Sequence, residues 1–133
     1  MIFEATYRVS FGDCDPAGIV FYPNLFAWLD RTFHRLLDEK AGGHAAVCKV
    51  LGAKGIGLTH ADCSFKSPVT ESVDLTVALS DITWDARTFT LAYTGRIGDR
   101  TAFEGAETRA VFTEKDGRVG LGDVAPLRAA LNI

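Results

Sequence analysis

Two aspartates, Asp13 and Asp15, stand in a loop punctuated by glycine and proline, directly before a segment with the apolar spacing of a helix. A carboxylate held just ahead of a helix lies beside free backbone N–H groups and the positive end of the helix dipole. Such a loop combines an anionic base or nucleophile with donors that stabilise a developing oxyanion. The pattern therefore predicts an acyl-transfer site.

Of the two carboxylates, Asp15 is the predicted catalytic residue, because it adjoins Pro16 and the start of the helix. Asp13 is better suited to hydrogen bonds within the turn. Such hydrogen bonds could also explain both aspartates without any catalytic role. A calcium loop of the EF-hand type is disfavoured, since Ala17 and Asn24 occupy positions that require an oxygen ligand and a closing glutamate. No metal site is expected.

Residues near the helix start supply the other half of the predicted site. The backbone N–H near Tyr22 is the candidate oxyanion donor. Gly18 would let a substrate carbonyl approach the backbone, although relief of a positive φ explains this glycine as well. Phe21, Tyr22 and Trp28 are candidates to line an acyl pocket, and core packing explains them equally well.

The histidines and cysteines offer weaker alternatives. His60 lies beside Asp62 in a predicted strand, where it either contacts substrate or is an ordinary sheet residue. A Cys14–His60 dyad is disfavoured, because a thiol between two aspartates has its pKa raised rather than lowered. The sequence contains no GxSxG or HExxH motif and no dinucleotide or Walker phosphate loop, so serine, zinc and nucleotide hydrolysis lose support.

The composition describes one globular domain, residues 1–133, with 47% hydrophobic residues. A net charge of −3 and the lack of any basic stripe argue against a nucleic-acid partner. No apolar stretch is long enough to enter a membrane, and Met1 is followed by no signal-peptide pattern. The three cysteines show no disulfide or zinc spacing. We therefore expect a cytoplasmic protein that needs no cofactor.

Hydrophobic periodicity predicts an α+β domain with a largely antiparallel sheet and one helix on its face. Apolar spacings of three and four predict the helix over 22–41, with Pro23 at its start and Gly42 just after its end. Residues 42–57 are expected to be loop with one short helical turn. Alternation predicts strands at 2–11, 58–65, 73–80, 89–93 and 102–112, followed by a tail helix at 125–131.

The loop, the helix and the strand order together resemble the hotdog-fold acyl-CoA thioesterases, most of all the 4-hydroxybenzoyl-CoA thioesterase branch. Residues 12–20, Gly-Asp-Cys-Asp-Pro-Ala-Gly-Ile-Val, match the catalytic loop of that family position by position. The resemblance implies a hotdog fold, a five-stranded antiparallel sheet wrapped around one long helix. It also implies hydrolysis of an aromatic or short acyl-CoA thioester, with Asp15 as nucleophile or as base for a water.

The resemblance further implies a homodimer or homotetramer whose sites lie at the interface. A second chain's strand would bring Thr59, His60 or Asp62 to the loop that holds Asp15. The strand Ser72–Ser80 carries one charge and no proline, so it is expected to leave a sheet edge that is open to pairing.

One segment departs from the pattern of the family. Members can carry a basic cluster after the tryptophan of the third strand, where coenzyme A phosphates bind. Here Trp84 is followed by a single arginine, Arg87, and an added acid, Asp85. Arg87 and Thr88 are kept as candidate substrate contacts. Other cations proposed for the phosphates are Lys54, Lys66, Arg100 and Arg128.

Two alternative functions stay open. A non-catalytic binder of acyl-CoA or aromatic ligands would share the fold, although an idle carboxylate near an apolar site weakens binding. An enoyl-CoA hydratase-like enzyme is less favoured, because such enzymes use a histidine near the helix and residues 11–33 contain none.

Overall fold

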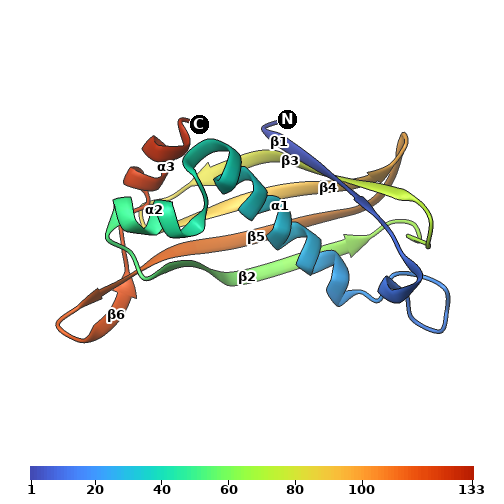
Figure 1. The fold of residues 1–133 in the computed structure, drawn as a ribbon, viewed down its shortest axis with the longest axis horizontal. Helices are drawn as coiled ribbons and strands as arrows, with labels where there is room; N and C mark the ends of the chain where they lie inside the picture. The colour runs from blue at the N-terminus through green and yellow to red at the C-terminus, as the bar shows by residue number, and fades with distance from the viewer.

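A long helix, α1 (Pro23–Ala41), lies across one face of an antiparallel sheet in the computed structural model, which describes residues 1–133 (Figure 1). The sheet has the strand order β1-β3-β4-β5-β2, and the short β6 pairs with β5. The strands are β1 (Phe3–Arg8), β2 (Gly55–Phe65), β3 (Asp74–Trp84), β4 (Thr88–Ile97), β5 (Arg100–Lys115) and β6 (Arg118–Leu121). The predicted α+β architecture of five strands around one long helix is confirmed, with β6 as an addition.

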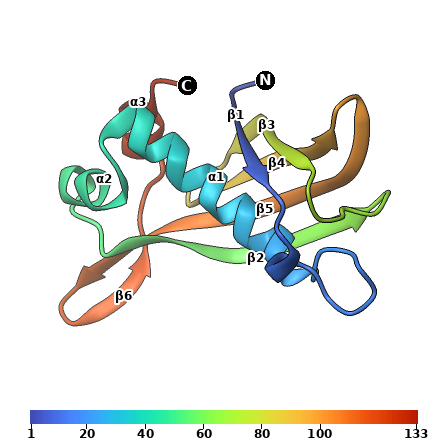
Figure 2. The same ribbon diagram turned by 45° about the vertical axis from the view of Figure 1, so that its right-hand side comes forward.

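The two ends of the sheet differ in what surrounds them. Two shorter helices, α2 (His44–Leu51) and α3 (Ala125–Leu131), lie at one end, and the loop between β1 and α1 lies at the other (Figures 1 and 2). That loop begins with a single 3-10 turn, η1 (Phe11–Asp13). None of the helices is long and apolar enough to cross a membrane.

Helix α1 is held on the sheet by one continuous apolar face. Its buried residues recur every three or four positions and are Leu25, Trp28, Leu29, Thr32, Phe33, Leu36 and Leu37. Thr32 donates its hydroxyl to the Trp28 carbonyl at 2.7 Å and also bonds the Tyr7 hydroxyl of β1 at 2.9 Å, so the buried polar group is satisfied. Full burial contributes about 1.5–3 kcal/mol for each large apolar side chain, which fixes the helix axis and therefore its start.

The prediction of mostly loop over 42–57 is wrong, because the eight residues of α2 form a helix there. The glycines bracket this helix rather than interrupt it: Gly43 precedes it, and Gly52 ends it with a φ of 63°. Val47 and Cys48 are buried against the core, so tertiary packing supplies the stability that the weak periodicity did not reveal.

The expectation of an open edge at Ser72–Ser80 is also wrong. That segment belongs mostly to β3, which pairs with β1 on one side and with β4 on the other. The chain returns from β2 to the far side of the sheet, so the free edges are β1 and β2. β2 pairs only with β5 and leaves its other side unpaired over eleven residues.

Candidate active site

The loop before α1 folds back on itself as a narrow hairpin. Cys14 and Val20 form a β-bridge, and the Asp15 N–H donates to the Ile19 carbonyl at 2.9 Å. The Gly18 N–H donates to the Asp15 carbonyl at 2.9 Å, which closes the turn. Gly18 has a φ of 81°, and a Cβ added there would meet no atom within 4 Å. The left-handed backbone, rather than crowding, therefore requires glycine in this structure.

The two aspartates of the loop are bonded differently. Both Ser10 donors, the backbone N–H at 2.9 Å and the hydroxyl at 3.1 Å, bond one carboxylate oxygen of Asp13. Asp15 as a residue is half-buried, and its carboxylate Oδ1 accepts the Ala17 N–H at 2.8 Å. Its Oδ2 has no partner in the chain. This contrast supports giving the chemical role to Asp15 and a turn-forming role to Asp13.

The start of α1 leaves one donor free beside this hairpin. Tyr22 is the N-cap residue, and its backbone N–H donates to no group of the protein. The Asn24 side chain does not cap the helix; it donates to the Asp13 carbonyl at 2.9 Å and so fastens the hairpin to the helix. The Asp15 backbone pairs with Ile19, and Ile19 precedes Tyr22 by three residues in the chain. A free carboxylate oxygen and a free N–H therefore belong to one short, rigidly bonded segment at the positive end of the helix dipole.

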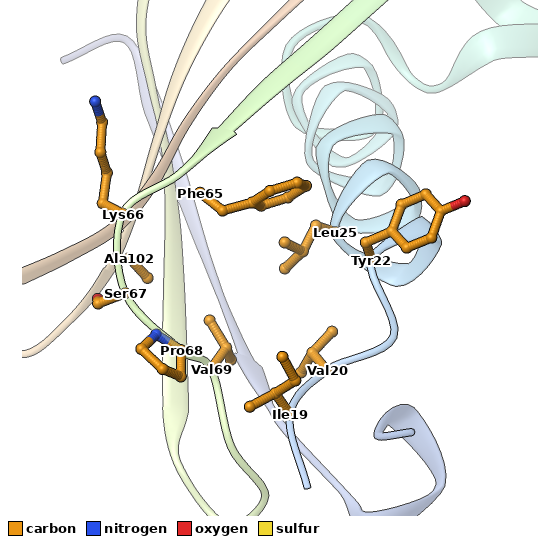
Figure 3. Close-up of a pocket in the computed structure, with 10 residues that line it drawn as sticks. All are labelled: Ile19, Val20, Tyr22, Leu25, Phe65, Lys66, Ser67, Pro68, Val69 and Ala102. Atoms are coloured by element: carbon orange, nitrogen blue, oxygen red, sulfur yellow. The ribbon is translucent and has the colours of Figure 1, made fainter. Parts of the chain in front are cut away.

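An apolar cavity of about 350 Å³ opens next to Tyr22 (Figure 3). One wall comes from the loop and α1, and the other from the end of β2, the segment that follows it and β5. The Val20 N–H donates to the Val69 carbonyl at 2.8 Å and ties the two walls together. The lining residues are Ile19, Val20, Tyr22, Leu25, Phe65, Lys66, Ser67, Pro68, Val69 and Ala102.

Comparison with solved structures shows what this arrangement is similar to. A gentisyl-coenzyme A thioesterase is 28% identical with a TM-score of 0.78, covering 94% of this chain and 98% of that one. The 4-hydroxybenzoyl-CoA thioesterase of Pseudomonas sp. strain CBS-3 is 26% identical with a TM-score of 0.80, covering 96% of each chain. A mutant of 4-hydroxybenzoyl-CoA thioesterase in complex with 4-hydroxybenzoyl-CoA reaches a TM-score of 0.84 at 24% identity over 96% of each chain.

The chain is a hotdog-fold protein. Its structural neighbours are thioesterases, as the resemblance of the loop predicted. Among curated proteins, the 4-hydroxybenzoyl-CoA thioesterase of Pseudomonas sp. strain CBS-3 is 70% identical over 23 residues, which span 17% of this chain and 16% of that protein. No family model matches the sequence.

The hotdog structure places the predicted aromatic contacts unequally. Tyr22 lines the cavity. Phe21 is 48% exposed and packs its ring edge-on against Tyr22, with the centroids 5.4 Å apart, but it does not line the cavity. Trp28 is buried and stacks on Tyr7 of β1, so the structure does not bring it to the cavity.

Thr59, His60 and Asp62 lie on β2, the free edge of the hotdog sheet. Thr59 sits at a bulge and donates its hydroxyl to the Thr108 carbonyl at 3.2 Å. His60 Nε2 and Asp62 Oδ2 are 3.2 Å apart, and both side chains are exposed. None of the three lines the cavity, so within one chain they are edge residues.

Arg87 and Thr88 lie toward the opposite end of the sheet. Thr88 pairs with Ala110 of β5, whereas Phe65 at the cavity pairs with Phe103, seven residues away along the strand. Seven residues of strand span roughly 23 Å. Arg87 donates to the Leu121 carbonyl at 2.6 Å. One chain alone therefore does not bring these two residues to Asp15.

Of the other cations proposed for the coenzyme A phosphates, two lie away from the cavity and two lie at its wall. Lys54 forms an ion pair with Glu114 at 2.8 Å, and the Arg128 guanidinium lies 5.8 Å from the centre of the Trp84 ring. Lys66 lines the cavity. Arg100 donates to the Ser67 hydroxyl at 2.7 Å and to the Pro68 carbonyl at 3.1 Å. Lys66 and Arg100 are thus the two that the structure brings to the cavity wall.

Sequence reasoning missed the second wall of the cavity. Phe65 is the last residue of the predicted strand 58–65 and of β2, and Pro68 lies in the irregular segment that follows; Phe65 is 58% exposed. In the sequence, the only available signal was a phenylalanine three residues before a proline. It did not indicate that Ala102, 37 positions further along the chain, faces the same space.

The thiols do not form an activated nucleophile. Burial, followed by the charges of Glu71, Asp13 and Asp15, raises the pKa of Cys14, which confirms the predicted direction. A different pair, Cys48 Sγ and His44 Nε2, lies 3.6 Å apart. Burial raises the pKa of Cys48 and lowers that of His44, and the same His44 nitrogen accepts the Ile56 N–H. A neutral thiol beside a neutral imidazole is a poor nucleophile.

Proposed function

We propose that this protein is an acyl-CoA thioesterase that hydrolyses an aromatic or short acyl-CoA thioester to the free acid and coenzyme A. One observation carries the proposal: Asp15 has a carboxylate oxygen without a partner, Tyr22 has a free N–H in the same short segment before α1, and Tyr22 lines an apolar cavity, although Asp15 and Gly18 do not. The thioesterase names of the structural neighbours, one with bound 4-hydroxybenzoyl-CoA, support it.

In the proposed reaction the thioester oxygen accepts a hydrogen bond from the Tyr22 N–H, in the field of the α1 dipole. Asp15 either attacks the carbonyl carbon or removes a proton from an attacking water. The C–S bond then breaks, and coenzyme A leaves as a thiolate, so no strong general acid is required. Water supplies the hydroxyl oxygen of the product acid. Loss of one oxyanion donor typically costs about 2.7–4 kcal/mol in the transition state.

We also propose that the active form is a homodimer or a homotetramer built by pairing along β2. This edge is eleven residues long, lacks proline and carries one carboxylate, Asp62, so it is a ready template for a second strand. Antiparallel pairing about a two-fold axis reverses the second sheet. The reversal would bring the partner's Arg87 toward the end of the sheet that holds Asp15.

Assembly is tested by sedimentation and by dilution. Particles larger than one 14.4 kDa chain at micromolar concentration, with activity per chain falling as they separate, are the expected result. A fully active monomer would contradict the composite site.

The activity itself is tested by thiol release from a panel of aroyl-CoA and aliphatic acyl-CoA thioesters. The proposal expects turnover of at least one aromatic or short acyl thioester. Calorimetric binding of the same thioesters without thiol release would instead favour the non-catalytic binder. Water addition to an enoyl-CoA, followed by its absorbance, would favour the hydratase.

A further inference from the structure

The backbone carbonyl of Asp13 joins the two limbs of the loop hairpin to helix α1. It accepts the Phe21 N–H at 2.9 Å and the side-chain amide of Asn24, also at 2.9 Å. Phe21 belongs to the returning limb, directly before Tyr22, and Asn24 belongs to the first turn of α1. Asp13 itself precedes Asp15 by two residues. One oxygen atom therefore links the chain on both sides of the proposed reaction centre.

Asn24 is an unexpected residue type at this point of the helix. The first turn of α1 contains no acidic residue, although a carboxylate there would interact favourably with the positive end of the helix dipole. Asparagine is also a poorer helix former than glutamate or alanine, and the N-cap of α1 accepts no side-chain hydrogen bond in return. What asparagine supplies and a carboxylate does not is an N–H donor. Helix stability therefore does not explain Asn24, whereas its bond to Asp13 does.

Asn24 provides the one side-chain hydrogen bond from α1 to the limb that carries Asp15. Within the hairpin, backbone bonds at Asp15 and Phe21 hold the two limbs together. The Asn24 bond fastens this unit to the first turn of the helix, whose N-cap residue is Tyr22. A displacement of about 1 Å in a catalytic group can cost on the order of a hundredfold in rate. The bond is thus placed to control the separation of the Asp15 carboxylate and the Tyr22 N–H.

We infer that Asn24 is a positioning residue, which holds the Asp15 carboxylate and the Tyr22 N–H at the separation that thioester hydrolysis requires. The inference rests on the proposed thioesterase function and deepens it. Asn24 contacts no reacting atom in this scheme; it acts through the Asp13 carbonyl on the backbone that carries Asp15. Its loss should therefore lower kcat, whereas a residue that only binds substrate would change KM.

Two substitutions remove the donor and keep a side chain of similar size. Asn24→Leu is uncharged, and Asn24→Asp adds a charge that suits the start of a helix. We expect kcat to fall at least about tenfold in both variants, with KM within about twofold of the native value. The denaturation midpoint of Asn24→Asp should stay close to the native one, because the helix dipole offsets the lost hydrogen bond. Native kcat in both variants, with a lowered midpoint, would show a purely structural role and overturn the inference.

Ala27→Asp is the matched control for the added charge. Ala27 is exposed on the same helix, three residues after Asn24, and does not line the cavity. This variant should keep kcat within about twofold of the native value. An equal loss of kcat in Ala27→Asp and Asn24→Asp, with native kcat in Asn24→Leu, would assign the effect to charge and refute positioning by Asn24.

Hydrogen exchange separates this inference from the proposed activity, because it needs no substrate. The amides of Asp15 and Phe21 close the hairpin, and in Asn24→Leu they should exchange about two- to tenfold faster, the factor expected for the loss of one hydrogen bond. The amide of Leu91, in the buried centre of β4, should keep its native rate. Native exchange at Asp15 and Phe21 would overturn the inference even in an active thioesterase. Faster exchange, without thiol release by the native protein from any thioester, would instead refute the proposed function and with it the catalytic consequence of positioning.

Discussion

Two groups of charged residues lie near helix α1, and they are bonded in opposite ways. At the helix start, Asp15 keeps a carboxylate oxygen without a protein partner. Two turns further on, the Arg109 guanidinium of β5 donates to Asp30 at 2.6 Å and to Glu107 at 3.0 Å, and Tyr93 donates to Glu107 at 2.8 Å. In the buried group, both carboxylate oxygens of Glu107 are bonded, and no fully buried side-chain N or O atom lacks a partner.

Burial explains the difference. The side chains of Arg109 and Glu107 are 2% and 1% exposed, so an unpaired charge there would be strongly destabilising. Burial alone would lower the pKa of Arg109, but Glu107 and Asp30 outweigh it and raise that pKa. Burial, followed by the charge of Glu107, raises the pKa of Tyr93. Groups paired this completely hold the helix on the sheet, whereas a group with an unpaired oxygen can reach a substrate.

The largest effect is expected from breaking the buried group. Arg109→Met leaves Glu107 buried without its counter-charge and should lower the free energy of unfolding by about 3–5 kcal/mol, measured by denaturant titration. Arg96→Met is the matched control, because Arg96 is 35% exposed and pairs with Glu4 at the surface. That control should change stability by less than about 1 kcal/mol. Equal losses in the two variants would show that the buried group is not structural.

The next effect should appear in turnover rather than stability. Asp15→Asn removes the proposed base or nucleophile and should lower kcat at least about a hundredfold, with little change in the melting temperature. Asp13→Asn alters the other carboxylate of the same hairpin and should cost less activity, because Asp13 is bonded back to Ser10. More than a tenth of the native turnover in folded Asp15→Asn would remove Asp15 from the mechanism.

The smallest effect concerns alkaline pH. Burial, then the charge of Asp62, raises the pKa of Cys63 to about 11. Between about pH 9 and pH 11 the folded state keeps this proton and the unfolded state loses it, so stability falls as pH rises. The free energy of unfolding of Cys63→Ala should therefore fall less than that of the native protein over this range, by on the order of 1 kcal/mol. An equal fall in the free energy of unfolding with pH for the two proteins would contradict the raised pKa of Cys63.

Local signals account for the part of the protein that could be predicted. The α1 helix follows from apolar spacing together with Pro23 and Gly42, and the tail helix matches α3 (Ala125–Leu131). Strands β2, β4 and β5 contain the predicted segments and extend beyond them. Strand β3 contains the segment 73–80 except Val73, whereas β1 is shorter than the predicted 2–11. These features depend on residues within a few positions of one another, so composition and periodicity suffice. The candidate loop was found for the same reason, because Asp15, Gly18 and Tyr22 are close in sequence.

The sequence by itself thus determined the elements and the loop that would carry chemistry. Tertiary structure alone decided that β2 rather than β3 is an open edge, because alternation does not encode which strands become neighbours. It alone joined Val69 and Ala102 into one cavity. It also paired Arg109 with Asp30, 79 positions apart, in a strand where a charged residue on the buried face had no local explanation. Contacts between distant residues form only when the core buries apolar surface, and no pattern along the chain records them.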